Sequence, residues 1–170
     1  MRRVVTGHTS DGKAILVSDN EVDALVPGME FYEIWGADEA PTFPDNGLPY
    51  PHTSYFPPLG GFRFDTFTVP PESTPESETV NYQAALAAME EKLPDLVSCM
   101  EKGNPGMHTT DTIDFEYVIS GEVWLELDDG KEVHLQAGDT VIQNGTRHAW
   151  RNHSSEPCRM VVCMIGANRK

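Results

Sequence analysis

Apolar and polar positions alternate over short stretches in the C-terminal half of the chain. From Val123 to Leu127 every second residue is aliphatic, and a period of two is typical of a half-buried strand. A second strand-like run, Lys131 to Leu135, follows after the dipeptide Asp129-Gly130. Because Asp-Gly between two such runs favours a tight turn, this region is predicted to be a β-hairpin.

The same kind of pattern recurs along the rest of the chain. Further short strands are predicted at Arg2–Thr6, Ala14–Ser18, Met29–Trp35, Phe62–Val69 and Cys158–Ile165. Pro70-Pro71 ends the fourth of them, since proline cannot donate a hydrogen bond to a central ladder. Many short strands separated by glycine turns favour an all-β fold, with a closed antiparallel barrel as its natural form.

Two stretches interrupt this strand pattern. Residues 37–61 are rich in proline and form either a loop over the barrel mouth or a plain surface connection. Within residues 72–105, a helix is expected from near Tyr82 to Lys92 with Asn81 as its N-cap, and a second helix from Pro94 to Met100. We therefore expect a single domain over residues 1–170: N-terminal strands and loop (1–61), a barrel strand (62–71), a helical insertion (72–105) and a core (106–170).

Charge narrows the classes of partner. The chain has 27 acidic and 12 basic residues, a formal net charge of −15, which disfavours nucleic acids and anionic membranes because their phosphates would be repelled. No apolar run approaches the roughly 20 residues that span a bilayer. Three cysteines without the spacing of a metal finger predict reduced thiols and a cytoplasmic protein. A small molecule is the expected partner.

Two blocks of residues carry the candidate chemistry. The first contains His108, Asp114 and Gly121, and the second contains Gly138, Gly145, His148 and Asn152. In spacing they resemble the two conserved motifs of the cupin superfamily, with two departures: Thr110 stands where the second histidine is usual, and Asp114 stands where glutamate is usual. The surrounding sequences TDTID and NGTRHAWRN further resemble a group of small single-motif cupins.

The resemblance implies an all-β, cupin-type double-stranded antiparallel β-barrel (jelly roll), to which the residue pattern adds extra N-terminal strands and a short helical insertion. It also implies a homodimer, and a divalent metal ion held by His108, Asp114 and His148. Two histidines and a carboxylate leave coordination positions open. Iron, zinc, manganese, nickel or cobalt would suit these ligands, and the sequence does not choose between them. The alternative is that both histidines are only hydrogen-bonded residues at strand ends.

Glu116 is the most informative neighbour of the proposed ligands. Because side chains alternate between the faces of a strand, Glu116 shares the inward face with Asp114 if the strand is regular. It is then a fourth metal ligand, a hydrogen-bond partner of a ligating histidine, or the catalytic acid–base. If the strand is bulged, Glu116 is instead a solvent-exposed residue.

The remaining candidates are expected around the pocket. Trp150 is predicted to form an apolar wall, and Arg147 and Arg151 to meet an anionic substrate at the rim. The expected function is that of a metal-dependent cupin enzyme acting on a small carbonyl or carboxylate compound by decarboxylation, isomerisation or dioxygenation. A non-catalytic small-molecule-binding module and a metal-free structural barrel are the alternatives.

Overall fold

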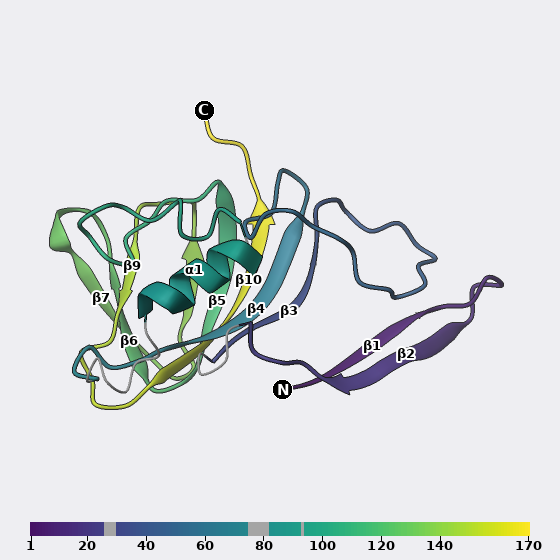
Figure 1. The fold of residues 1–170 in the computed structure, drawn as a ribbon, viewed down its shortest axis with the longest axis horizontal. Coiled ribbons are helices and arrows are strands. Elements are labelled where there is room, and N and C mark those ends of the chain that lie inside the picture. Colours follow the sequence, from purple (N-terminus) through teal and green to yellow (C-terminus); the bar gives the residue numbers. More distant parts are fainter. Residues whose placement is uncertain (26–29, 75–81, 93) are drawn as a thin grey trace.

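The protein is described from a computed structural model that covers residues 1–25, 30–74, 82–92 and 94–170. These residues form three antiparallel sheets and one α-helix. Two of the sheets, with five and three strands, face each other and make the body of the molecule (Figure 1). The third is a two-stranded arm that extends away from the body.

The five-stranded sheet has the order β3-β4-β10-β5-β8. Its strands are β3 (Phe31–Ala37), β4 (Phe62–Val69), β10 (Cys158–Gly166), β5 (Thr112–Ser120) and β8 (Thr140–Gln143). The apolar strand β10 lies at the centre, where its Val162 pairs with Asp65 of β4 on one side and with Glu116 of β5 on the other. The strand predicted at Cys158–Ile165 is therefore confirmed, one residue longer than predicted.

The three-stranded sheet has the order β7-β6-β9. Its strands are β6 (Glu122–Glu126), β7 (Glu132–Gln136) and β9 (Ala149–Arg151). The predicted hairpin is confirmed, because β6 and β7 pair and a short 3-10 turn at Asp128–Gly130 joins them. Asp129 adopts a left-handed backbone with φ 58°, a conformation that Asp tolerates better than most residues.

Alternating side chains of both sheets fill the space between them. In β5 every second residue from Thr112 to Val118 is buried, and Val118 packs in one cluster with Val123, Met160 and Cys158. The result is the two-layer arrangement of a double-stranded β-helix, and the expected all-β jelly roll is confirmed.

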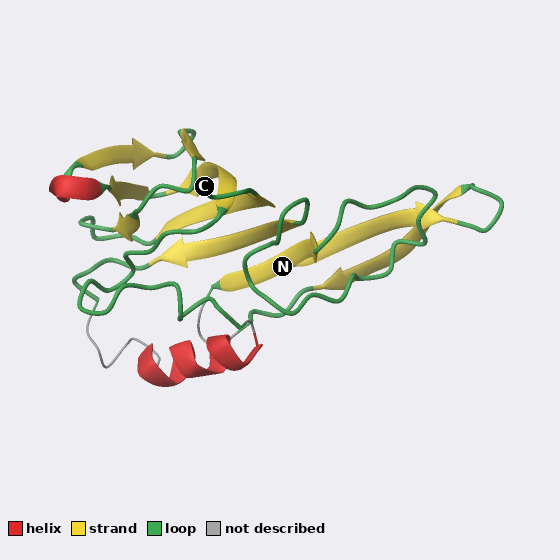
Figure 2. Cartoon of the chain, turned by 90° about the horizontal axis from the view of Figure 1, so that it is seen from above, coloured by secondary structure: helices red, strands yellow, loops and turns green. Residues whose placement is uncertain are grey.

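The N-terminal strands form a separate arm. β1 (Arg2–His8) pairs only with β2 (Ala14–Glu21) within the described residues, and both strands run longer than predicted. Figure 2 shows this arm extending beyond the end of the five-stranded sheet, alongside the proline-rich loop. Arg3 ties its base to the body by donating a hydrogen bond to the carbonyl oxygen of Ile34 at 3.0 Å.

The helical insertion differs from the prediction in its second half. Helix α1 (Tyr82–Lys92) has the predicted bounds, whereas the residues after Pro94 form turns and not a helix. Asp95 has φ 76°, which a right-handed helix cannot contain, and its backbone N–H is satisfied by the Glu90 carboxylate at 3.0 Å. Two smaller predictions, the strand start at Met29 and the cap at Asn81, lie outside the described residues.

In the part of the chain that the structure describes, no helix is long and apolar enough to cross a bilayer.

Candidate functional site

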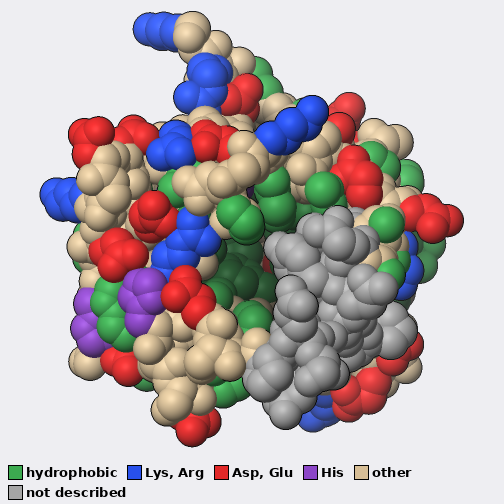
Figure 3. All heavy atoms as spheres, turned by 60° about the vertical axis from the view of Figure 1, so that its left-hand side comes forward, with side chains coloured by type: hydrophobic (Ala, Val, Ile, Leu, Met, Phe, Trp, Pro, Cys, Tyr) green, Lys and Arg blue, Asp and Glu red, His purple; other side chains and the backbone are tan. Residues whose placement is uncertain are grey.

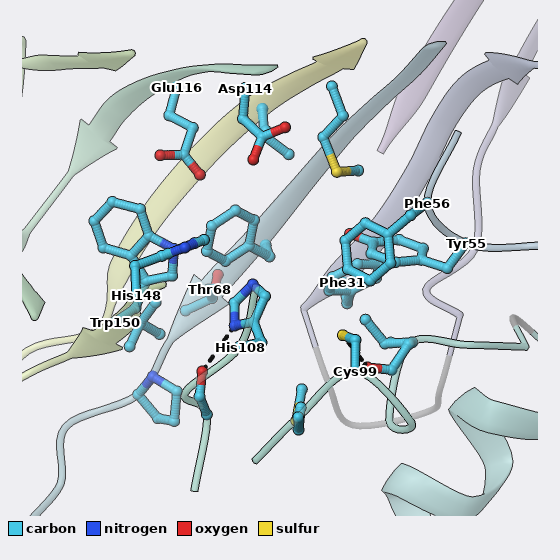
Figure 4. A pocket seen from close by; sticks show the side chains of 18 residues that line it. Phe31, Tyr55, Phe56, Thr68, Cys99, His108, Asp114, Glu116, His148 and Trp150 are labelled. Carbon is cyan, nitrogen blue, oxygen red and sulfur yellow. Dashed lines mark hydrogen bonds between the residues drawn. The ribbon is translucent and has the colours of Figure 1, made fainter. Parts of the chain in front are cut away.

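A cavity of about 270 Å³ lies between the two main sheets. The space-filling view shows a hollow lined by hydrophobic side chains on this side of the molecule (Figure 3). The close-up in Figure 4 shows which predicted residues line this cavity. They are the two histidines, the two carboxylates and Trp150. The structure therefore brings together residues that are up to 42 positions apart, from His108 to Trp150.

The two histidines are held side by side by their backbones. His108 and His148 exchange a pair of N–H to carbonyl hydrogen bonds, each 2.9 Å long, and their ring centroids are 4.3 Å apart. Each ring donates from Nδ1 to a nearby carbonyl oxygen, at 2.8 Å to Gly106 and at 2.9 Å to Thr146. This fixes the tautomer and leaves the lone pair of each Nε2 available, as in metal-ligating histidines.

Burial keeps both imidazoles neutral. It lowers the pKa of His108, and it lowers the pKa of His148 to about 4 with a further contribution from the neighbouring His108. Only neutral imidazole can donate its lone pair to a metal ion. At neutral pH both rings are therefore in the form that a ligand requires.

The carboxylates come from the inward face of β5. Asp114 and Glu116 are 4% and 6% exposed, and Asp114 Oδ1 and Glu116 Oε2 have no hydrogen-bond partner among the described residues. Burial raises the pKa of Asp114 to about 6. Burial and the nearby Asp114 charge raise the pKa of Glu116 to about 8. Two unpartnered carboxyl groups in a cavity are costly, and a bound partner would offset that cost.

Glu116 faces inward, as a regular strand predicts. It pairs in register with Val141 of β8 and Val162 of β10. The irregularity of β5 comes later in the strand, beyond Val118. The alternative in which a bulge turns Glu116 towards solvent does not match this structure.

The donors occupy two walls of the cavity. Figure 4 shows the carboxylates of Asp114 and Glu116 on one side and the imidazoles on the other. Among the described residues, no three His, Cys, Asp or Glu side chains lie together as a group that can hold a metal ion. The predicted ligands thus share one cavity, in which the two histidine rings lie in contact.

Thr110, at the position of the missing histidine, is used for packing. Its side chain is 5% exposed, and its hydroxyl shares a 2.8 Å hydrogen bond with the Thr112 hydroxyl. Gly145 of the second motif lies against its backbone: a Cβ on Gly145 would be 2.9 Å from the Thr110 carbonyl oxygen. The two motif segments therefore meet through backbone at this point.

The three predicted pocket residues have different outcomes. Trp150 lines the cavity with its ring centroid 6.0 Å from that of His148. Arg147 instead pairs with Glu101 at 2.6 Å and with Asp128 at 3.1 Å. Arg151 pairs with Glu126 at 2.6 Å. Both arginines are thus paired with acidic neighbours, and neither is among the described residues that line the cavity.

Sequence reasoning missed the aromatic end of the cavity. Phe31, Tyr55, Phe56 and Phe67 line it, and two of these residues come from the proline-rich loop. The signal was available: that loop was a candidate cover for the barrel mouth, and the strand before it is rich in aromatic residues. What the sequence did not show was which rings turn inward.

Comparison with known proteins finds a family match over part of the chain. The family described as Cupin domain matches residues 96–164. Phomopsin biosynthesis cluster protein C' of Diaporthe leptostromiformis is 36% identical over 97 residues, which are 54% of this chain and 51% of that protein. A cupin-domain-containing oxidoreductase of Neurospora crassa is 38% identical over 60 residues, 35% of this chain and 31% of that protein. The chain therefore spans about half the length of the first of these two curated relatives and about a third of the second.

Solved structures give more distant similarities. The cupin domain of an XRE family transcriptional regulator from Enterobacter cloacae has a TM-score of 0.37 at 23% identity, covering 63% of this chain and 83% of that one. An uncharacterized conserved protein with a double-stranded β-helix domain from Klebsiella pneumoniae has a TM-score of 0.40 at 21% identity, covering 64% and 70%.

Proposed function

We propose that this chain is a metal-dependent cupin enzyme, and its match to the Cupin domain family over residues 96–164 supports this. Its substrate would be a small carbonyl or carboxylate compound that binds in the cavity between the two sheets. One divalent ion, of iron, zinc, manganese, nickel or cobalt, would be bound there by His108 and His148, with Asp114 as the third ligand.

One observation carries the proposal. Within one cavity, two neutral imidazoles have their Nδ1 atoms fixed by carbonyl groups. Two buried carboxyl groups there each have an oxygen that no described residue hydrogen-bonds. These are suitable donors for a divalent transition metal. Since the described residues contain no ready-made group of three ligands, binding requires the carboxylate and imidazole walls to approach each other.

The chain's own residues have separable roles in this proposal. A bound metal ion would polarise a carbonyl or carboxylate oxygen of the substrate. Glu116, buried beside Asp114, can take up or deliver a proton at its carboxyl oxygen within the cavity. Trp150 and the aromatic end exclude water from the substrate, which strengthens electrostatic interactions inside.

The alternative is a non-catalytic small-molecule-binding module. The absence of a preformed three-ligand group among the described residues favours it, since a binding module needs the cavity and no metal ion. The two functions differ in one measurable property, the metal content of the protein.

Elemental analysis of protein purified without added metal tests the proposal. We expect about one equivalent of a single transition metal per chain, as one site requires. Metal-free protein that also takes up no divalent ion on dialysis against iron, zinc, manganese, nickel or cobalt would contradict the enzyme proposal and favour the binding module.

We also propose that the chain forms a homodimer through the outer face of the five-stranded sheet. Six large apolar side chains on this face are 39–52% exposed. They are Phe64, Phe115, Tyr117, Ile119, Ile142 and Ile165. The strand register aligns one continuous row of side chains across four strands: Phe64, Cys163, Phe115 and Ile142.

The size and charge of this face suit a second copy. Its exposed apolar area is on the order of 450 Å², estimated from the 150–250 Å² that an aromatic side chain can bury. That area would fill the core of a standard interface of roughly 800 Å² per partner. The six side chains carry no charge in a chain of net charge −15, so two copies can bring these residues together without acidic repulsion between them.

Light scattering after size exclusion tests this interface. Wild type should have the mass of a dimer at micromolar concentration, and Phe115→Glu should be monomeric, because it places two charges in an apolar contact. Val133→Glu is the control, since Val133 is similarly exposed at 39% but lies on β7 of the other sheet. A monomeric wild type, or a dimeric Phe115→Glu variant, would contradict the proposal.

A further inference from the structure

We infer that the substrate of this site is an uncharged small molecule that joins an aromatic ring to a carbonyl head. This inference rests on the proposed function and names its substrate class. The ring would occupy the aromatic end of the cavity, and the head would lie between the carboxylates and the imidazoles. Three features of the cavity support it: a continuous series of rings, the absence of a cation in its described lining, and its size.

The rings form a wall that leads to the histidines. The centroids of Phe31 and Tyr55 are 5.7 Å apart, and Tyr55 meets Phe56 edge-on at 4.7 Å. Phe56 is in turn stacked on His108, with centroids 6.4 Å apart and planes 28° apart. Aromatic pairs favour these separations. An aromatic substrate can therefore add one more ring to the series while its head reaches His108.

Some of these rings line the cavity in addition to packing in the hydrophobic core. Tyr55 is 5% exposed and packs with Leu96 and Val162 in a core cluster. Phe31 and Phe56, by contrast, are only partly buried and border the cavity. Figure 4 shows Phe31, Tyr55 and Phe56 gathered at one end, with Glu116 and Trp150 at the other. The unfilled apolar surface faces inward, where a ligand and not solvent is its natural partner.

The lining disfavours an acidic substrate. No Lys or Arg is present among the described residues that line the cavity, and the two nearby arginines pair with acidic residues outside it. Asp114 and Glu116 add acidic groups to the same space. The carboxylates of Asp114 and Glu116 would already balance the charge of the proposed divalent ion. A free carboxylate on the substrate would then add a buried negative charge with no protein cation to offset it, which is costly. A neutral carbonyl avoids that cost.

The cavity volume limits the substrate to one ring. Its 270 Å³ lies just below the 300–1,000 Å³ usual for small-molecule pockets. A phenyl group with a short polar arm fits this space. Larger polycyclic molecules require the surrounding segments to move.

Ligand-binding measurements on the protein as purified test the inference with three probes. They are 4-phenylbutan-2-one, butan-2-one and 3-phenylpropanoate. Their binding is followed by ligand-observed NMR and by intrinsic tryptophan fluorescence. We expect the phenyl ketone to bind at least about 10-fold more tightly than butan-2-one, since a buried ring contributes well over 1.4 kcal/mol. The carboxylate probe, which resembles the phenyl ketone in shape, should bind at least about 10-fold more weakly than it.

Variants of the cavity wall test where the phenyl ring of the ketone binds. Phe56→Ala should reduce the affinity for the phenyl ketone by about 10-fold or more and leave that for butan-2-one nearly unchanged. Phe43→Ala is the control, because Phe43 comes from the same proline-rich loop but is 71% exposed and lies outside the described cavity lining. If Phe56→Ala fails to fold, Phe31→Ala tests the same aromatic wall, and it should likewise reduce the affinity for the phenyl ketone.

The outcomes separate this inference from the proposed function. Equal binding of the phenyl and alkyl ketones, tighter binding of the carboxylate, or a phenyl preference unaffected by both wall variants would overturn the inference, whatever the metal content. A ring preference that depends on Phe56 in a protein without metal would support the inference, while the enzyme proposal would fail.

Discussion

Replacing His148 with alanine should abolish metal retention. The variant loses one of the two neutral imidazoles whose rings are 4.3 Å apart, and the remaining His108 and Asp114 are too few ligands to hold the ion. We expect affinity to fall by more than about 100-fold, beyond the 10–100-fold typical of losing a group that only supports a ligand. His108→Ala should have the same effect. Elemental analysis at neutral pH and titration with zinc measure both losses.

A surface histidine provides the control for this experiment. His134 is hydrogen-bonded to Glu122 at 2.7 Å and stacked on Trp124, on the outside of the three-stranded sheet. His134→Ala should keep its metal and its melting temperature. If His108→Ala and His148→Ala both retain a full equivalent of metal while folded, the ligand assignment is wrong and another part of the chain holds the ion.

Strand content and inward orientation were predictable because both depend on local alternation. The run from Val123 to Leu127 and the Asp129-Gly130 turn identified the hairpin, and parity with Asp114 placed Glu116 in the interior. Both follow from the period of two along a strand. The spacing of the two motifs also placed His108 and His148 correctly in one cavity, since motif glycines fix where the segments turn.

Features set by tertiary contacts could not be predicted in the same way. The helix expected after Pro94 does not form, because Asp95 has a left-handed backbone and Glu90 satisfies its N–H; helix-forming residues alone gave no sign of this. Arg147 and Arg151 had suitable positions for a substrate contact, but Glu101 and Glu126 lie within 2.6 Å of them. Pairings between distant residues of opposite charge leave no periodic signal in the chain.

Glu116 should make the stability of the metal-free protein fall as pH rises. Its pKa is about 8 in the fold, against an ordinary value of 4.5, so the fold favours the protonated form. Stability is therefore fully present below about pH 4.5 and is lost as pH rises towards about 8. Linkage makes this loss several kcal/mol, or on the order of 10 °C in melting temperature. Thermal melts of chelator-treated protein between about pH 6.5 and pH 8, above the ordinary histidine pKa of 6.5, measure it.

Glu116→Gln should remove most of this dependence, because the amide keeps the size of the side chain but cannot ionise. Asp65→Asn is the matched control: Asp65 is also a fully buried carboxyl, on β4, with its pKa raised by burial and by the charge of Glu33. Asp65→Asn should remove the contribution of Asp65 to the pH dependence of the melting temperature. The contribution of Glu116 should remain. His108 and His148, whose pKa values are lowered, contribute the opposite slope equally in both proteins. An unchanged pH slope in Glu116→Gln would therefore show that Glu116 is solvated.

The same variant distinguishes the catalytic roles of Glu116. If the carboxyl transfers protons, Glu116→Gln should keep its metal while turnover of an aromatic carbonyl substrate falls by roughly 10²–10⁴-fold, the usual contribution of a general acid–base. If the carboxyl is a metal ligand, metal affinity should fall first and activity should recover in excess metal. Unchanged metal affinity together with unchanged turnover would eliminate both roles. Glu116 would then act only through the charge that it places in the cavity.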